Sequence, residues 1–417
     1  MEHFFNPKSV AVIGASSTKG KIGYEIVANI AGSGIPVFPV NPHRDTILGK
    51  RCYKSVEEIP EEVDLAVLAI DAEKCAPAVE QCGRKGIRRV VIISGGFRET
   101  GNEELEQELV ATARKYGIRI IGPNCIGVFN GTTGINTFFQ RHMELPPPGT
   151  VSIMTQSGTF GIALLEKFAR EHIGVNHFAS YGNRADVNEV DLLAHFEDDS
   201  ATRIIAVYVE DMGRDFFSRK FTKPVVVLKA GRSRLGQKAA SLHTGAMATD
   251  YAIFKGACRQ KRVIFADDFQ EFFGIIKILA LQGTPPGRSI AIITNGAGPG
   301  VLACDFLDSA QHLEVSGDMV DLTGSATADD YLRAIDESTA DIIILTFVFQ
   351  DAPLAETLDT LYEGLRTRNR FFVALAMGGT FPEEQMSTLA SMGIPAFEEP
   401  GVAIRALNAI AMHLLRP

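Results

Sequence analysis

The sequence predicts an α/β protein made of three consecutive doubly wound units. A short apolar segment of strand length, followed by a turn of small residues and a helical pattern, occurs three times, starting at residues 9, 150 and 289. Each segment is a continuous apolar run rather than an alternating one, which is typical of strands buried on both faces of a parallel sheet. Strand, turn and helix in this order open a doubly wound sheet.

Further apolar segments continue the alternation in each third. In the first third, the strand 9–13 and the turn 14–16 precede a predicted helix over 22–31 and strands over 36–40, 65–70, 90–94 and 118–121. In the middle third, the strand 150–154 and the turn 155–159 precede a helix over 160–170 and strands over 204–209 and 224–229. In the last third, the strand 289–293 and the turn 294–300 precede a helix over 301–310 and strands over 341–346 and 371–376.

Two proline-bearing segments, 145–149 and 283–287, separate the thirds. Proline ends regular structure and stiffens a linker. We therefore predict three domains, at residues 1–144, 145–286 and 287–417.

Composition narrows the class of protein. The formal net charge of -9 and the lack of a Lys- and Arg-rich tract argue against nucleic-acid binding. The six cysteines form no Cys-x-x-Cys pair and have no histidine at metal-ligand spacing, so we expect no metal site and a reducing compartment. The sequence shows no signal-peptide pattern and no apolar run of the roughly 18–20 residues that span a membrane. We therefore expect a cytoplasmic protein that makes no membrane contact.

The turn after the first strand has the features of a nucleotide site. Residues 14–16 let backbone N–H groups approach a pyrophosphate at a helix start, and Lys19 and Lys21 add positive charge. A NAD site would have a second glycine in place of Ser16 and a carboxylate after the second strand. That strand is followed instead by Asn-Pro-His-Arg at 41–44, which favours a phosphorylated ribose. Coenzyme A or NADP is therefore expected rather than NAD.

Two later loops fall at the same edge of the predicted sheet. Ser-Gly-Gly-Phe at 94–97 follows the fourth strand, and Gly-Pro-Asn-Cys at 122–125 follows the fifth. Ligands bind at the carboxyl ends of such strands, so both loops are candidate walls of the site. The alternative is that both are only tight turns.

The middle third carries a candidate phosphate site. Ser157, Gly158 and Thr159 stand at a predicted helix start, where hydroxyls and unpaired backbone N–H groups can hold a phosphate. The simpler interpretation is an ordinary N-cap by Ser157. Glu210 follows the strand 204–209 at the same edge, where a carboxylate can accept an imidazole N–H and fix its tautomer. Asp211 can do the same, so the pattern leaves this choice open.

A histidine among small residues is the candidate nucleophile. His243 lies in Ser-Leu-His-Thr-Gly-Ala, residues 241–246, ahead of a predicted helix over 246–260. Imidazole is a competent nucleophile, and the N–H groups of a helix start favour phosphoryl oxygens. We therefore predict that His243, in a loop, is phosphorylated during turnover. The alternative is a loop histidine without a role.

Five motifs, in order along nearly the whole chain, resemble one known family. They are Pro-Lys-Ser-Val-Ala-Val-Ile-Gly-Ala-Ser at 7–16, Ile-Gly-Pro-Asn-Cys-Ile-Gly at 121–127, Ile-Met-Thr-Gln-Ser-Gly at 153–158, Gly-Asn-Arg-Ala-Asp-Val at 182–187, and Leu-Lys-Ala-Gly-Arg-Ser at 228–233 running on to the His243 motif. The chain resembles the alpha subunit of the NDP-forming acyl-CoA synthetases of the acetate–CoA ligase (ADP-forming) type, relatives of succinyl-CoA synthetase.

This resemblance implies a Rossmann-like CoA-binding domain followed by two flavodoxin-like domains. It implies that His243 is phosphorylated, that Glu210 is its stabilising carboxylate, and that Ser157, Gly158 and Thr159 bind phosphate. The candidate residues for coenzyme A are Gly14, Ala15, Ser16, Lys19, Lys21, Asn41, Pro42, Ser94, Gly95, Pro123 and Asn124.

The implied reaction converts a small carboxylic acid, CoA and a nucleoside triphosphate into acyl-CoA, the diphosphate and phosphate, and it is reversible. In the family, the acyl phosphate passes its phosphoryl group to the histidine and then to the nucleotide. Mg-ATP or Mg-ADP is held by an ATP-grasp domain, for which we find no pattern here. We therefore expect a separate ATP-grasp beta subunit, in an α2β2 assembly.

Two departures from the family pattern fall in the last third. Asp-Met-Val-Asp at 318–321 replaces the usual Asn-Pro-Val-Asp, and residues 347–351 lack an expected proline, so both changes bear on how the third domain packs. Two alternative functions are a non-catalytic CoA-binding regulatory protein and an NADP-dependent oxidoreductase. The retained His243 and Glu210 argue against the first, and the interrupted glycine pattern argues against the second.

Overall fold

The computed structural model describes residues 1–244 and 250–414, with the side chains of Arg214 and of residues 241–244 outside the description. The contacts divide the chain into two compact units. One contains residues 1–170, 174–225 and 229–257, and the other contains residues 171–173, 226–228 and 258–417. The chain builds three large sheets, and the predicted boundaries of three domains stay a prediction.

The first sheet is parallel and has the strand order β2-β1-β5-β6-β7. Its strands are β1 (Val10–Ile13), β2 (Val37–Val40), β5 (Leu65–Leu68), β6 (Arg89–Ile92) and β7 (Arg119–Ile121). A separate antiparallel pair consists of β3 (Thr46–Ile47) and β4 (Lys50–Arg51). Numbered within the sheet, the order is 2-1-3-4-5, a doubly wound arrangement.

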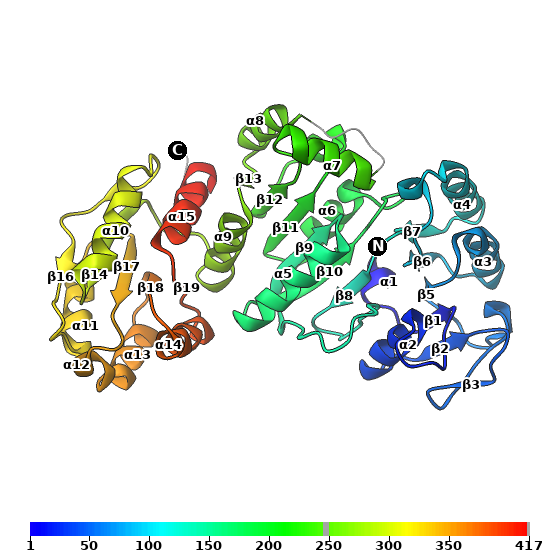
Figure 1. The fold of residues 1–417 in the computed structure, drawn as a ribbon, viewed down its shortest axis with the longest axis horizontal. Helices are drawn as coiled ribbons and strands as arrows, with labels where there is room; N and C mark the ends of the chain where they lie inside the picture. Colours follow the sequence, from blue (N-terminus) through cyan, green and yellow to red (C-terminus); the bar gives the residue numbers. More distant parts are fainter. Residues whose placement is uncertain (245–249, 415–417) are drawn as a thin grey trace. The chain divides into compact units, whose positions relative to one another are not determined.

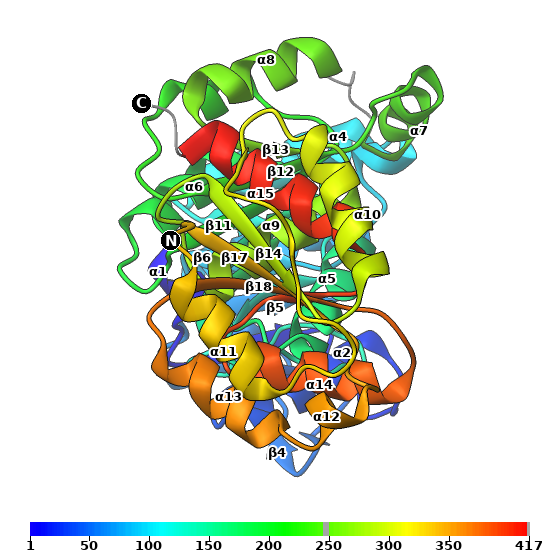
Figure 2. The same cartoon turned by 90° about the vertical axis from the view of Figure 1, so that its left-hand side faces the viewer.

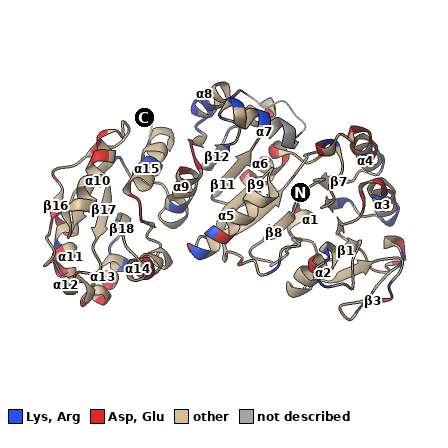
Figure 3. Ribbon diagram, viewed as in Figure 1, with Lys and Arg blue, Asp and Glu red and all other residues tan. Residues whose placement is uncertain are grey.

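Helices cover both faces of this sheet. The helices α3 (Ala72–Lys85) and α4 (Glu103–Lys115) lie side by side and share one apolar cluster with the strands (Figure 1). The helix α2 (Ile22–Gly32) contributes nothing to that cluster and packs against β1 with its own buried face. The strands are almost free of charged residues, whereas α3 and α4 carry both acidic and basic ones (Figure 3).

The second sheet has the order β13-β12-β11-β9-β10-β8. Its strands are β8 (Gly127–Asn130), β9 (Pro148–Thr155), β10 (Val175–Ser180), β11 (Ile204–Val209), β12 (Val225–Lys229) and β13 (Ile264–Ala266). The five strands from β9 onward repeat the 2-1-3-4-5 order, and β8 adds an antiparallel edge next to β10. Sequence analysis does not predict β10, because Asn176 and His177 interrupt its apolar run.

The helices of this part are α5 (Gly158–Arg170), α6 (Glu189–Asp198), α7 (Arg234–Thr244), α8 (Tyr251–Lys261) and α9 (Phe269–Leu281). Two predictions are wrong here. His243 belongs to the last turn of α7 rather than to a loop, because the small residues at 239–241 are compatible with a helix. The predicted linker 145–149 is partly strand, since Pro148 and Gly149 already belong to β9, at the end of which proline is tolerated.

The third sheet also has the 2-1-3-4-5 order, as β15-β14-β17-β18-β19, and β16 pairs with β14. Its strands are β14 (Ser289–Thr294), β15 (Glu314–Val315), β16 (Val320–Asp321), β17 (Ile342–Phe347), β18 (Phe371–Ala376) and β19 (Ala396–Phe397). In Figure 2, α10 (Ala297–Asp308) and α15 (Pro400–Leu414) lie on one side of it, and α11 (Ala328–Glu337), α13 (Leu358–Thr367) and α14 (Thr380–Ser391) lie on the other. The short α12 (Ala352–Ala355) precedes α13.

The third sheet accommodates both departures from the family pattern. Val320 and Asp321 form β16, and a Cβ on Gly300 would lie 2.4 Å from the Met319 sulfur. Asp351 accepts a hydrogen bond from the Asn295 side chain at 3.0 Å. The helix α10 begins four residues earlier than predicted, because Pro299 falls in its first turn, where no intrahelical N–H is needed.

Two histidines, the buried His177 and the half-buried His195, pack beside the first helix, α1 (Glu2–Phe5). The His177 and His195 rings stack with centroids 5.6 Å apart, and both contact the Phe5 ring. Burial lowers the pKa of His177 from 6.5 to about 4, against the opposing effect of the Asp199 carboxylate. Both rings are therefore neutral in the folded protein at neutral pH, since burial also lowers the pKa of His195.

We predict an acid-sensitive stability from His177. The unfolded chain binds a proton at this ring below about pH 6.5, and the folded chain does so only near pH 4. The contribution of His177 to the free energy of unfolding is therefore fully present above pH 6.5. The free energy of unfolding falls by about 3 kcal/mol as the pH drops to about 4. The apparent melting temperature of His177→Leu, measured from pH 7.5 to 4, should fall less steeply than that of the native chain. The exposed His43→Leu serves as the control, and equal slopes for all three proteins would contradict the prediction.

We also predict that two glycines of α2 respond in opposite ways to alanine. A Cβ at Gly23 would lie 2.0 Å from the Gly14 carbonyl oxygen, whereas a Cβ at Gly32 would meet nothing within 4 Å. Gly23→Ala should destabilise the protein by about 1–3 kcal/mol, because two backbone segments would have to separate. Gly32→Ala should stabilise it by about 0.5–1 kcal/mol through helix propensity. Thermal unfolding of both variants measures the difference, and a Gly23→Ala protein as stable as the native one would contradict it.

Candidate active site

The turn after β1 lies at the carboxyl edge of the first sheet, beside the point where the strand order reverses between β1 and β5. Gly14 has φ +91°, and a Cβ there would lie 2.2 Å from the Ala69 carbonyl oxygen. The Asn41 side chain donates a hydrogen bond to the Ala15 carbonyl at 2.8 Å. This bond joins the first predicted loop to the loop after β2, and Lys19 and Lys21 stay exposed next to it.

The other two predicted loops meet at the same edge. The Ser94 hydroxyl accepts a hydrogen bond from the Ile70 N–H at 3.2 Å, and the Asn124 N–H donates to the Ser94 carbonyl at 2.8 Å. Pro123 is buried behind Asn124. A Cβ at Gly95 would lie 3.4 Å from the Asn124 side-chain oxygen, so these residues are close together. Their binding of coenzyme A stays a prediction.

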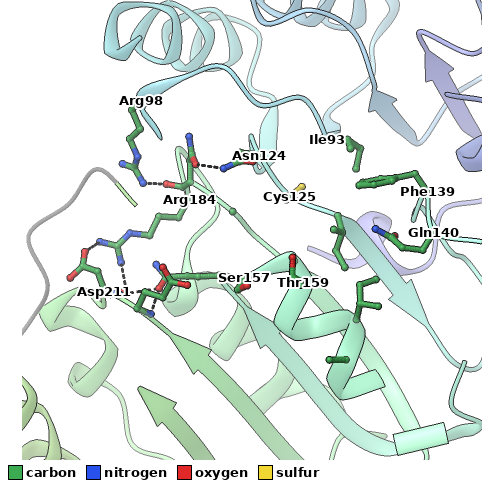
Figure 4. A pocket seen from close by; sticks show the side chains of 18 of the residues that line it. Ile93, Arg98, Asn124, Cys125, Phe139, Gln140, Ser157, Thr159, Arg184 and Asp211 are labelled. Atoms are coloured by element: carbon green, nitrogen blue, oxygen red, sulfur yellow. Dashed lines mark hydrogen bonds and ion pairs between the residues drawn. The ribbon is translucent and has the colours of Figure 1, made fainter. Parts of the chain in front are cut away.

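A cavity of about 600 Å³ opens where the first-sheet loops meet the carboxyl ends of β9 and β11. Figure 4 shows Arg98, Arg184 and Asp211 on one side, Ile93, Phe139 and Gln140 on the other, and Ser157 and Thr159 between them. Of the predicted residues, the cavity wall contains Asn124, Ser157, Gly158, Thr159 and Glu210. It also contains Cys125, Ile126, Gln156, Ile162, Ala163, Glu166, Gly182 and Asn183.

The start of α5 forms part of this wall. The Ser157 hydroxyl accepts a hydrogen bond from the Phe160 N–H at 3.3 Å, so the ordinary cap predicted as the simpler interpretation is present. The Thr155 hydroxyl fixes the backbone before it, accepting from the Ser157 N–H at 3.1 Å. A Cβ at Gly158 would lie 2.6 Å from the Ile126 side chain. The start of the helix, whose first N–H groups have no intrahelical partner, thus lies in the cavity wall, and its binding of a phosphate stays a prediction.

Glu210 is buried at the end of β11, and its backbone is clamped. The Gln156 side-chain oxygen accepts from the Glu210 N–H and, at 3.0 Å, from the Asp211 N–H. The Lys229 ammonium donates to the Glu210 carbonyl at 3.3 Å. Burial lowers the pKa of Lys229, and burial together with the Glu210 charge raises the pKa of Tyr208. The hydrogen bonds fix the backbone of Glu210 in the cavity wall.

Asp211 is held by a different partner. Its carboxylate accepts from the Arg184 guanidinium at 2.8 Å, and Arg184 also donates to Glu189 at 2.9 Å. The carboxylate of Asp211 therefore forms an ion pair with the Arg184 guanidinium. Which of the two carboxylates, Glu210 or Asp211, contacts a histidine stays a prediction.

Residues 182–187 connect the two sheets at the cavity. The N–H groups of Asn183, Ala185 and Val187 donate to the carbonyls of Pro123, Gly122 and Ile120 at 2.9, 3.2 and 3.0 Å. A Cβ at Gly182 would lie 2.2 Å from the Asn124 carbonyl oxygen. The motif at 182–187 contributed only to the resemblance, and the pattern did not predict that Asn183 and Arg184 line the cavity.

Other wall residues also escaped the sequence analysis. Arg98 begins a 3-10 helix directly after the predicted loop 94–97. Phe139 and Gln140 belong to an irregular segment without a motif, and only folding brings them to the cavity. Gln156, by contrast, is adjacent to Ser157 in a recognised motif. Its position could therefore have predicted that it lines the cavity.

His243 lies on α7, and its side chain falls outside the described residues, as do Gly245 and Ala246. Its distance to Glu210 and to the start of α5 is therefore not part of the described geometry. Among the residues that the structure describes, no cluster of three or more His, Cys, Asp or Glu side chains is arranged to hold a metal ion. In the same part of the chain, no helix has the length and apolarity needed to cross a membrane.

We predict that Gln156 orders the backbone at 210–211. Gln156→Leu removes the acceptor of two buried N–H groups, which costs about 1–3 kcal/mol for each group left unpaired. Hydrogen exchange of a peptide covering 210–211 should be faster in this variant, and the apparent melting temperature should fall. Gln156→Glu keeps an acceptor oxygen and should exchange more slowly than Gln156→Leu. If hydrogen exchange at 210–211 is the same in Gln156→Leu as in the native chain, the Gln156 side chain does not order this backbone.

Comparison with known proteins identifies the family of the chain. A family model described as a CoA binding domain matches residues 8–131, and one described as a succinyl-CoA ligase like flavodoxin domain matches residues 148–279. These matches confirm the predicted fold class.

Two relatives from Pyrococcus furiosus are the alpha subunits of acetate–CoA ligase (ADP-forming) I and II. They are 40% and 36% identical to this chain, and the alignments cover 98% and 99% of it and 97% and 98% of the relatives. The dinucleotide forming acetyl-coenzyme A synthetase 1 of Ca. Korarchaeum cryptofilum, solved with phosphate and ADP, superposes with a TM-score of 0.90 at 31% identity, covering 99% of this chain and 96% of that one. The predicted resemblance is confirmed, and this chain belongs to the family of the alpha subunits of ADP-forming acetate–CoA ligases.

Proposed function

We propose that this chain is the CoA-binding, phosphohistidine-carrying subunit of an acyl-CoA synthetase. The reaction converts a carboxylic acid, CoA and ATP into acyl-CoA, ADP and phosphate, and it is reversible. The observation that carries this proposal is the cavity, whose wall combines the start of α5, the buried Glu210 and Asn124 of the first-sheet edge. Phosphate and thioester chemistry both need such a place, where an anion site and a nucleotide-binding edge meet.

The first-sheet edge is the part that would bind CoA. The turn at 14–16 passes close to the neighbouring backbone because Gly14 and Gly23 lack side chains. The Gly14 N–H already donates to the Val40 carbonyl at 3.1 Å, so the N–H groups of residues 15 and 16 would be the ones that bind a pyrophosphate. Lys19 and Lys21 add positive charge. The remaining candidates on this edge are Asn41, Pro42, Ser94, Gly95, Pro123 and Asn124.

The middle sheet would perform the phosphoryl transfer. The N–H groups at the start of α5, with the Ser157 and Thr159 hydroxyls, stabilise the charge on the phosphoryl oxygens. A ring nitrogen of His243 attacks the phosphorus of the acyl phosphate, the N–P bond forms, and the bond from phosphorus to the acyl oxygen breaks to release the carboxylate. Glu210 accepts the N–H of the other ring nitrogen and keeps the attacking nitrogen unprotonated.

A partner chain would hold the nucleotide. The relatives named as alpha subunits have nearly the same extent as this chain, whereas acetate–CoA ligase (ADP-forming) I of Archaeoglobus fulgidus, 37% identical over 99% of this chain, is covered over only 64% of its length. This difference supports a beta subunit of the ATP-grasp type that binds Mg-ATP and Mg-ADP. An α2β2 assembly in the cytoplasm completes the proposal. The relatives' names do not favour an NADP-dependent oxidoreductase.

We expect His243 to take up the phosphoryl group. The chain, reconstituted with its beta partner and γ-labelled Mg-ATP, should acquire an acid-labile, base-stable label, and His243→Asn should reduce the label to background. The exposed His172→Asn serves as a matched control and should label fully. A labelled His243→Asn protein would refute the assignment of the residue. Absence of label and of acyl-CoA formation in the native complex would support the non-catalytic regulatory alternative instead.

A further inference from the structure

We propose that Arg184 is a positioning residue that neutralises Asp211, so that Glu210 is the carboxylate that contacts a histidine. This inference rests on the proposed function, in which that histidine is His243, and adds to it the residue that decides between two adjacent carboxylates. Two separate observations carry it, the partners of Arg184 and the direction of the Glu210 side chain.

The first observation is that Arg184 and Glu189 together hold the loop after β11. The Arg184 guanidinium donates to the Asp211 carboxylate at 2.8 Å and to the Asp211 carbonyl at 3.3 Å (Figure 4). It also donates to Glu189 at 2.9 Å, and the same Glu189 oxygen accepts from the Gly213 N–H at 2.7 Å. The loop 210–213 is therefore fixed by Arg184 directly at Asp211 and, through Glu189, at Gly213.

The charges in this cluster have little exposure to solvent. The exposed fraction is 21% for the Arg184 side chain, 13% for that of Asp211 and 2% for that of Glu189. Ion pairs with so little exposure are screened less than surface pairs, and charge-assisted hydrogen bonds of this length are strong. Lys229 adds a second cation beside the loop, since its ammonium donates to the Glu210 carbonyl at 3.3 Å. With Arg184 in place, the Asp211 carboxylate therefore has little net effect on a group in the cavity.

The second observation is that Glu210 lies on the α5 side of the sheet. Tyr208, two residues earlier on β11, stacks on Phe160 in the first turn of α5, with the ring centroids 4.0 Å apart. Alternate residues of a strand share one face. Burial, the Glu210 charge and a hydrogen bond between the two side chains together raise the pKa of Tyr208. Glu210 is thus directed toward the helix whose start is the candidate phosphate site, whereas Asp211 is directed toward Arg184.

The backbone that carries the guanidinium is itself fixed. The N–H groups of the residues on either side of Arg184 donate to the carbonyls of Pro123 and Gly122, and the Arg184 N–H donates to the Tyr181 carbonyl at 2.9 Å. Arg184 has a φ of +49°, in the left-handed region that glycine adopts with less strain. The contacts of the arginine side chain, which a glycine cannot make, offset that strain.

The role of Arg184 is tested by removing it together with its buried partner. Arg184→Gln alone leaves the buried Glu189 without a cation, so the base variant is Arg184→Gln/Glu189→Gln, in which an amide oxygen can still accept from the Gly213 N–H. The reconstituted complex is given labelled phosphate and a mixture of acetyl-, butanoyl- and hexanoyl-CoA, without nucleotide. The initial rate of His243 labelling is then measured from about pH 5.5 to about 8.5.

The base variant should lose rate mainly at the acid end of this range. An unneutralised Asp211 carboxylate favours the protonated imidazole, which cannot attack phosphorus. The acid limb of the profile should therefore move up by about 0.5–1 pH unit, which slows labelling there by about three- to tenfold. Asp211→Asn, added to the base variant, should reverse both changes, because it removes the carboxylate that Arg184 neutralises.

Two further variants separate charge from structure. Arg184→Lys keeps the positive charge and should remain within about threefold of the native rate. The exposed Arg219→Gln, outside the cavity wall, is the matched control and should not differ from the native complex. A purely structural role of Arg184 would lower the rate equally at every pH, and Asp211→Asn would not restore it.

Each remaining outcome overturns the proposal or the function beneath it. The proposal is wrong if the base variant has the native profile, or if the added Asp211→Asn leaves the profile shifted. If the base variant does not fold, single substitutions in the native chain decide. Glu210→Gln must then lower the rate more than Asp211→Asn does, and the reverse order overturns the proposal. A native complex that acyl-CoA and phosphate do not label refutes the proposed function itself, which is a different result from all of these.

Discussion

The three backbone hydrogen bonds between residues 183–187 and 120–123 are the interaction on which the rest of the site depends. They join the segment that follows β10 to the loop that ends β7, and so hold the carboxyl edge of the first sheet against that of the second. Backbone bonds of this kind do not depend on side-chain identity, but they require close approach. Gly182 permits that approach, since any Cβ there would collide with the carbonyl of Asn124. These bonds add to the antiparallel pairing of β8, which directly follows the loop around Asn124, with β10 of the second sheet.

Side chains strengthen the contact between residues 183–187 and 120–123, and some of these side chains also line the cavity. Asn183 donates to Glu99 at 2.6 Å and to Glu106 at 2.9 Å, and Arg98 donates to the Asn183 carbonyl. Arg119 pairs with Asp186 at 2.9 Å and with Asp191 at 3.0 Å on the far side of the same segment. Burial raises the pKa of Glu106, whereas the Asn183 side chain and backbone N–H groups lower that of Glu99. The polar wall of the cavity is therefore a part of the joint between the two sheets.

The third sheet has the same strand order, with a different polar residue after its first strand. There, the crevice between β14 and β17 is occupied by Asn295, which is almost fully buried. Its side chain donates to the Val348 carbonyl and to Asp351, and accepts from the Val348 N–H and the Tyr331 hydroxyl. In the second sheet, the equivalent crevice between β9 and β11 holds Gln156, whose side chain reaches the backbone at 210–211 and leaves space in front of it. Topology thus provides a possible ligand site three times, and side chains decide whether it is open.

The fold class follows from the amino-acid sequence, because continuous apolar runs followed by small-residue turns and helical patterns are typical of parallel sheets with helices on both faces. The sequence also determined which turns carry the candidate residues, since these stand at strand ends whatever the packing. The local pattern did not predict β10, because tertiary contacts stabilise the buried Asn176 and His177 that interrupt its apolar run. It also did not predict that His243 is helical, because small residues are compatible with both loop and helix. Tertiary contacts alone pair Asp211 with Arg184. They also place Phe139 and Gln140 in the wall of the same cavity as the start of α5. Those contacts join residues that are far apart in the sequence, and their energies depend on distances that no local pattern encodes.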